Sequence, residues 1–222
     1  MNELIEKLGN KECDEEESMN ITMILSDIME QKNFFSIISK KQNLIKLQEI
    51  SFSKDCPLAS RTSTLSLLTK FVQQFSDRVK SNFHDDSGSM DDGADDDIII
   101  DDSNNDENDE AKKKSDQIVY DVLEGFINPI TTLLKTEDAD TSRVSSLCDK
   151  EFRNLGILKL RAIELLSQLI SLKKPQINEV MVDSGVCQVL VQHVLDYPWN
   201  NFIQLKIHQV FEDYLDSENT NE

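Results

Sequence analysis

Apolar residues recur at intervals of three and four along most of the chain. This spacing places side chains on one face of an amphipathic helix. Four stripes of this kind are Ile21, Ile24, Leu25 and Ile28; Leu68, Phe71, Val72, Phe75 and Val79; Leu158, Ala162, Leu165, Leu166 and Leu169; and Ile203, Ile207, Val210, Phe211 and Tyr214. Polar residues such as Arg161 and Glu164 take the opposite positions in the third stripe. Convincing strand-like alternation is absent, so the pattern predicts an all-α fold.

Proline and glycine mark where the later helices begin and end. Pro175 stands where the first turn of a helix accepts proline, and Gly185 stands where a left-handed residue ends a helix. Pro198 follows an apolar run and stops it. Helices of about 10 to 20 residues joined by tight corners are typical of stacked helical repeats. We therefore expect an α-solenoid of HEAT-like or armadillo-like repeats, with an isolated helical bundle as the alternative.

The segment from 84 to 116 differs from its flanks. Between Asp85 and Glu110 it holds thirteen acidic residues and no Lys or Arg. Such a segment repels itself and cannot bury enough apolar surface to offset the entropy lost on ordering. We predict N-terminal helical repeats over 1–83, a disordered acidic loop over 84–116, C-terminal helical repeats over 117–216 and a flexible tail over 217–222.

The acidic segment holds candidate interaction motifs but no calcium loop. An EF-hand starting at Asp101 would need Gly at position 6 and Glu at position 12, where the chain has Asp106 and Lys112. The three isoleucines from Ile98 to Ile100 are flanked by acids, so they could add as a strand to a partner's sheet, as SUMO-interacting motifs do. Ser89 and Ser103 each precede an acidic residue by three positions, which makes them candidate phosphorylation sites.

Charge and cysteine usage narrow the class of protein. The net charge of −19 falls largely in the acidic segment, and the mildly acidic remainder is a poor candidate for binding nucleic acid. The four cysteines are scattered, and no signal peptide is recognisable at the first residues. No apolar run approaches the 18 residues of a membrane span. We expect reduced thiols and a location in the cytoplasm, or also the nucleus.

Catalytic motifs are missing from the sequence. The three histidines, His84, His193 and His208, lack metal-ligand spacing, and no nucleophile elbow or glycine-rich phosphate loop occurs. His193 and His208 are expected to be ordinary residues on polar or border positions of their helices. We therefore expect no enzymatic activity, no cofactor and no metal site.

The region from Leu155 to Leu215 resembles the Sit4-associated (SAPS) family. The resemblance rests on an L-G-x-x-[RK]-L helix start with Lys159 at its basic position, an N-x-x-[LIVM] helix followed by a glycine corner, and the block Y-P-W-N-N-F from Tyr197 to Phe202. Weaker likeness extends upstream and covers most of the chain. The chain starts in what resembles the middle of the family domain, so we expect it to be a fragment or a divergent short member of the family.

SAPS proteins are regulatory subunits of the type 6 serine/threonine protein phosphatase. The resemblance therefore implies a non-catalytic, helical-repeat scaffold that binds a type 6 (Sit4-like) phosphatase catalytic subunit and further scaffold subunits. The candidate partner-binding residues are Lys159, Arg161, Tyr197, Trp199, Asn200 and Asn201. The alternative is a generic helical-repeat adaptor with no phosphatase partner.

The Y-P-W-N-N-F block has a structural and a functional interpretation. In the structural one, Pro198 breaks a helix, one asparagine caps the next helix, the other bonds a neighbouring loop, and Trp199 and Tyr197 fill the space between repeats. In the functional one, Asn200 or Asn201 and the edge of Trp199 face a partner. The structural interpretation is favoured, because large aromatic side chains in a tight corner have an obvious packing role.

Overall fold

The computed structural model describes residues 1–84, 105–136, 144–145, 151–152 and 154–219. Its helices are α1 (Asn2–Leu8), α2 (Glu15–Glu30), α3 (Lys32–Ile38), α4 (Lys41–Phe52), α5 (Leu58–His84), α6 (Asn105–Glu124), α7 (Ile127–Lys135), α8 (Ile157–Ile170), α9 (Pro175–Asp183), α10 (Val186–Asp196) and α11 (Asn201–Asn219). Two strands of two residues each, β1 (Val144–Ser145) and β2 (Glu151–Phe152), pair antiparallel. The predicted all-α class is therefore confirmed, with this short ladder as the sole β-structure among the described residues.

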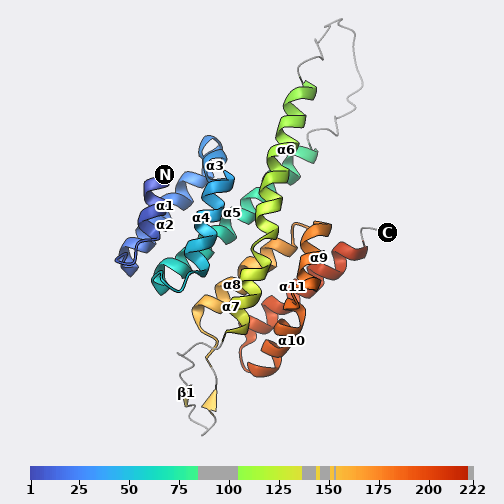
Figure 1. Cartoon of the computed structure of the whole chain (residues 1–222). Helices are drawn as coiled ribbons and strands as arrows, with labels where there is room; N and C mark the ends of the chain where they lie inside the picture. The colour runs from blue at the N-terminus through green and yellow to red at the C-terminus, as the bar shows by residue number, and fades with distance from the viewer. Residues whose placement is uncertain (85–104, 137–143, 146–150, 153, 220–222) are drawn as a thin grey trace, which may run out of the picture.

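The helices pack in two rows (Figure 1). In the first row, α5 lies between α2 and α8, and α8 lies between α5 and α11. In the second row, α4 contacts α1 and α7, and α7 contacts α10. Each second-row helix also packs on the first-row helix that comes directly after it in the chain: α1 on α2, α4 on α5, α7 on α8 and α10 on α11. A central first-row helix thus has neighbours on three sides and turns its fourth side outward.

One continuous hydrophobic core runs through both rows. A series of aromatic rings joins the chain before residue 85 to the chain after residue 104. The Phe35 and Phe71 rings stack with their centroids 5.0 Å apart, and Tyr120 meets the Phe75 ring edge-on, also at 5.0 Å. Leu165 and Leu166 are fully buried, as the stripe on this helix predicts. Because the core is shared, the N-terminal and C-terminal helices form one packed unit.

Several helix boundaries coincide with proline and glycine residues in the sequence. Pro175 is the first residue of α9. Gly185 has φ +72° between α9 and α10, and Gly156 has φ +79° just before α8. Both conformations favour glycine, because a Cβ would clash with the following carbonyl. The glycine of the L-G helix start therefore has a local backbone role.

The described helices extend past two of the predicted segment boundaries. The chain is helical from Asn105, so residues 105–116 do not belong to a loop. In this part of α6, exposed Lys114 and Glu110 form an ion pair, 2.8 Å apart at i,i+4 spacing, which supports the helix. The predicted flexible tail is helical to Asn219, and Ser217 is buried and accepts a hydrogen bond from Asn178 Nδ2 at 2.6 Å. Ser89, Ser103 and the isoleucines from Ile98 to Ile100 lie outside the described residues.

The described residues also bear on several chemical expectations. Cys13, Cys56 and Cys187 are free thiols, as predicted. Within the described ranges, no helix combines the length and apolar character that crossing a bilayer requires. In the same part of the chain, no three His, Cys, Asp or Glu side chains gather in a group that could hold a metal ion.

Candidate functional site

The Y-P-W-N-N-F block forms a rigid corner between α10 and α11. The Asn200 amide donates to the Tyr197 carbonyl at 3.0 Å, which closes a turn around Pro198 and Trp199. The Asn200 Oδ1 atom then accepts from the Ile203 amide at 3.2 Å and so caps α11. The Gln204 side chain reaches back and donates to the Pro198 carbonyl at 2.7 Å. These bonds fix the backbone of the corner from both sides.

The large side chains of this corner point to opposite environments. Tyr197 is only 9% exposed and packs against the His193 ring, with the centroids 5.7 Å apart. Trp199 is 68% exposed and Phe202 is 77% exposed. The predicted packing role is therefore confirmed for Tyr197 and wrong for Trp199.

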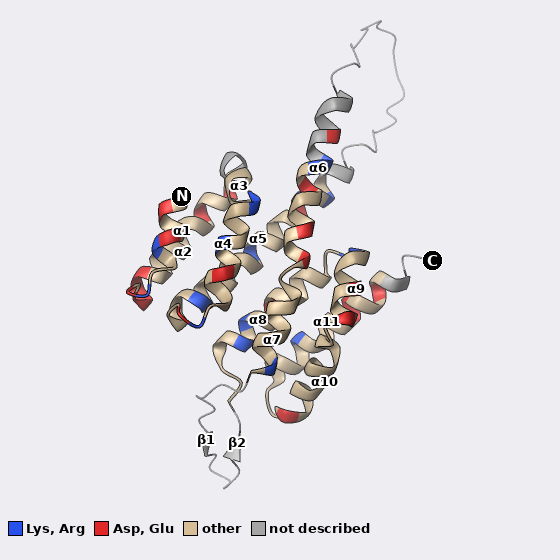
Figure 2. Ribbon diagram, viewed as in Figure 1, with Lys and Arg blue, Asp and Glu red and all other residues tan. Residues whose placement is uncertain are grey.

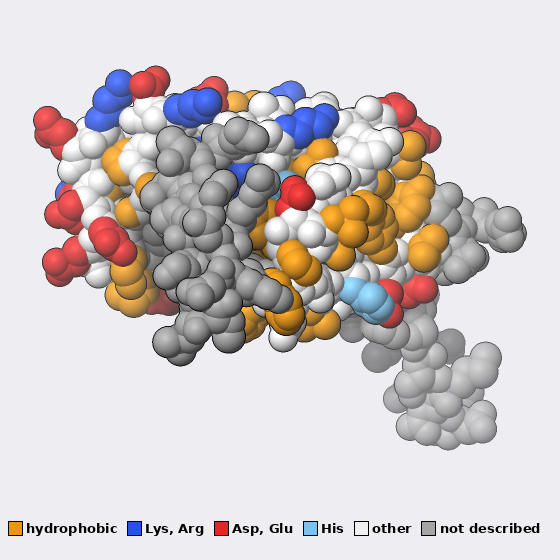
Figure 3. All heavy atoms as spheres, turned by 90° about the horizontal axis from the view of Figure 1, so that it is seen from below, with side chains coloured by type: hydrophobic (Ala, Val, Ile, Leu, Met, Phe, Trp, Pro, Cys, Tyr) orange, Lys and Arg blue, Asp and Glu red, His pale blue; other side chains and the backbone are white. Residues whose placement is uncertain are grey.

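Trp199 and Phe202 line one hollow together, and we call the exposed surface that they form the aromatic corner surface. Other apolar side chains exposed by half or more on the flanking helices are Val191 and Leu195 of α10 and Leu205 of α11. Residues Asp196 to Phe202 line a shallow hollow of about 340 Å³ within it. Figure 3 shows hydrophobic side chains gathered on part of the face seen from below. Exposed apolar patches with aromatic members are typical of protein–protein contact sites.

A buried polar pair lies beneath the corner. Lys159 of α8 is 4% exposed, and its ammonium group donates to the carbonyl of Thr136, the C-cap residue just after α7, at 2.6 Å. His193 of α10 is also buried. Burial lowers the pKa of the His193 imidazole, and the positive charge of Lys159 lowers it further. Both side chains thus lie in the interior. The prediction that Lys159 contacts a partner is wrong, and so is the prediction that His193 takes a polar or border position of its helix.

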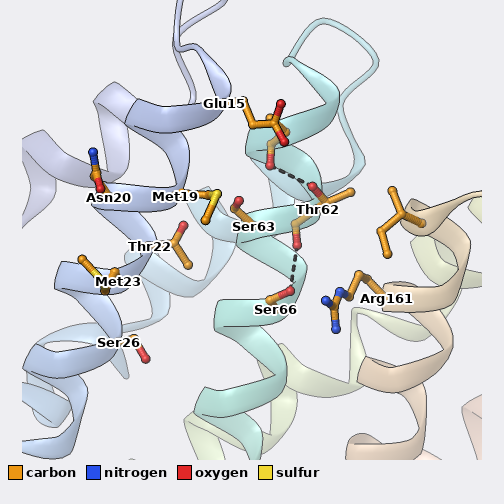
Figure 4. A pocket seen from close by; sticks show the side chains of 12 residues that line it. Glu15, Met19, Asn20, Thr22, Met23, Ser26, Thr62, Ser63, Ser66 and Arg161 are labelled. Carbon is orange, nitrogen blue, oxygen red and sulfur yellow. Dashed lines mark hydrogen bonds between the residues drawn. The ribbon is translucent and has the colours of Figure 1, made fainter.

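The remaining candidate partner-binding residues do not lie together in the structure. Asn200 caps α11, which is the predicted capping role, and its contact with a partner stays a prediction. Asn201 is exposed at the first turn of α11, which contradicts the interpretation that it bonds a neighbouring loop from the interior. Arg161 is not at the corner. It lines a groove of about 460 Å³ whose other residues come from α2, α5 and the start of α8 (Figure 4).

Acidic and basic residues are interspersed along the helices (Figure 2). Most of the ion pairs join exposed groups, such as Lys46 with Glu6 at 2.8 Å and Lys70 with Glu30 at 2.8 Å. Pairs of this kind contribute little to stability, because solvent screens them. Residues of the two signs are interspersed, so apolar surfaces and grooves are the better candidates for specific contacts.

Comparison of the chain with protein-family models, with curated proteins and with solved structures finds no match. The SAPS resemblance therefore remains an expectation from short motifs.

Proposed function

We propose that this protein is a non-catalytic helical subunit that binds the catalytic subunit of a type 6 (Sit4-like) serine/threonine phosphatase through the aromatic corner surface. One observation carries the proposal. The block that bears the family resemblance presents Trp199 and Phe202 to solvent, 68% and 77% exposed. Exposing two large aromatic side chains is unfavourable in an isolated chain, and a partner surface would remove them from water.

The packing of the helices supports a scaffold role. After α1 and α2, the remaining helices follow in groups of three, each with one member in the second row and the last in the first row. We infer that these groups are armadillo-like repeats. Repeats of this kind build long surfaces on which several partners can bind at once.

A generic helical adaptor with no phosphatase partner is the second candidate function. The apolar character of the aromatic corner surface favours it, because Trp, Phe and Leu side chains suit many partner surfaces and encode no enzyme class. The two functions differ in the identity of the bound protein, so the same surface can test both.

The experiment is a pulldown of the tagged full chain from its native organism, with bound proteins identified by mass spectrometry. A type 6 phosphatase catalytic subunit should be enriched by the parent and lost with the double variant Trp199→Ala, Phe202→Ser. Leu215→Ser is the matched control, because Leu215 is also exposed on α11, 59%, but lies thirteen residues beyond Phe202, about 20 Å along the helix. Enrichment of other proteins, without the phosphatase, would favour the adaptor and exclude the phosphatase function.

A further inference from the structure

A second surface, separate from the aromatic corner, is the groove that contains Arg161. Three first-row helices contribute to it, α2, α5 and α8, each through residues of its N-terminal half or middle. It shares no lining residue with the hollow at the corner. Figure 4 shows the lining side chains of the three helices, with Met19, Thr22 and Ser63 between α2 and α5 and Arg161 on α8.

The α2 side of the groove carries two adaptable apolar side chains among polar ones. Met19 and Met23 lie one turn apart and are 62% and 59% exposed. Methionine is flexible and polarisable, so it moulds around an incoming apolar side chain. Glu15 stands at the N-terminal end of the same wall, where its carboxylate favours a basic neighbour on whatever binds.

The α5 side forms a floor of small side chains, with Ala59, Thr62, Ser63 and Ser66 lining the groove. The Thr62 hydroxyl donates to the Ala59 carbonyl at 2.9 Å, and the Ser66 hydroxyl donates to the Thr62 carbonyl at 3.1 Å. Since each hydroxyl proton is directed into the helix, its oxygen keeps lone pairs that can accept a further bond. Small side chains with acceptor oxygens allow the backbone N–H groups of another chain to approach closely.

The α8 side carries the positive charge. The Arg161 Nη1 atom donates to Glu164 at 2.8 Å, and the Arg161 side chain is 39% exposed. A guanidinium has five N–H donors in a planar fork, so one bond to Glu164 leaves donors able to engage a second carboxylate. Exposed Ile157 lies one turn before it and extends the apolar lining.

We propose that this groove binds an extended segment of a partner protein that crosses α2, α5 and α8. An apolar side chain of the segment lies between Met19 and Met23, and an acidic side chain pairs with Arg161. Neighbouring helix axes are about 8–10 Å apart, so the distance from α2 to α8 is roughly 16–20 Å. An extended chain covers about 3.3 Å per residue, which separates the two side chains by about five or six positions. This inference does not depend on the phosphatase partner.

The experiment is a selection of displayed random decapeptides on the full chain, followed by affinity measurements on the enriched peptides. The expected peptides carry an apolar residue and, five or six positions away, Asp or Glu. Arg161→Glu should weaken them by about tenfold or more, since it replaces a charge-assisted bond with repulsion. Glu164→Gln should strengthen them, because it removes the competing carboxylate.

Two further variants locate the binding site. Met19→Ser combined with Met23→Ser should also weaken the peptides, while Trp199→Ala, at the corner, should leave their affinity unchanged. The proposal is overturned by enriched peptides that bind the Arg161→Glu variant as tightly as the parent, that lack an acidic residue at this spacing, or that depend on Trp199. It is equally overturned if the selection enriches no peptide.

Discussion

Trp199 and Tyr197 are two residues apart, and the structure predicts that replacing each by alanine lowers the free energy of unfolding by different amounts. Truncating a fully buried large aromatic residue costs about 3–5 kcal/mol. Tyr197 is 9% exposed, so Tyr197→Ala should lose stability within that range. Trp199 is 68% exposed and can lose only about a third of such packing, which gives roughly 1–1.7 kcal/mol.

The assay is unfolding in urea and by heat, followed by circular dichroism, on the parent and both variants. For a chain of this size, each kcal/mol lowers the melting temperature by about 2–4 °C, so the two variants should be clearly separated. Binding should show the reverse order for a partner at the aromatic corner surface, with Trp199→Ala the more damaging relative to its stability. Equal destabilisation by the two variants would refute the outward orientation of Trp199 and return it to the core.

Three other predictions concern neighbouring features. Leu165→Ala should cost about 2–5 kcal/mol because Leu165 is fully buried, whereas Leu215→Ala, at an exposed position, should stay within about 0.5 kcal/mol in the same unfolding assay. Asn200→Ala should lose about 0.5–2 kcal/mol with the cap of α11, and Asn201→Ala within about 0.5 kcal/mol; equal losses would contradict the cap assignment. Because burial and then Lys159 lower the folded-state pKa of His193, the unfolded chain binds the proton more readily, so stability should fall as pH drops below about 6.5 and then level off below the folded-state pKa. Melting curves of the parent and His193→Phe across this range should differ in slope, and identical pH profiles would exclude His193 as the cause.

The local signals in the sequence predict the helices and several of their ends. Pro175, Gly185 and Pro198 act where the sequence places them, because their effects are set by their own backbone chemistry. The cap by one asparagine was also predictable, and the structure identifies it as Asn200. The burial of Lys159 and His193 could also have been predicted, because their spacing along the helix places both on the apolar face although they are polar residue types. Lys159 precedes the buried Ile163 and Leu166 by four and seven positions, and His193 follows the buried Val186 and Leu190 by seven and three.

The exposure of Trp199 and the existence of the groove could not be predicted in this way. A tight turn can bury or expose a given side chain, and the outcome depends on which helices surround the turn. The groove joins Met19, Ser63 and Arg161, which come from three separate helices. Its formation depends on α5 packing between α2 and α8, a long-range arrangement that no local periodicity encodes.

The rigidity of the aromatic corner gives it an energetic advantage as a binding surface. A flexible loop loses conformational entropy when a partner orders it, and this loss lowers the affinity. Here the turn from Tyr197 to Asn200, the cap on α11 and the bond from Gln204 to Pro198 already hold the backbone. Trp199 has few rotatable bonds of its own, so most of the free energy gained by burying it against a partner is available for binding. In the complex that we propose, the polar residues of the block support recognition by holding the corner still, and the exposed rings supply the contact.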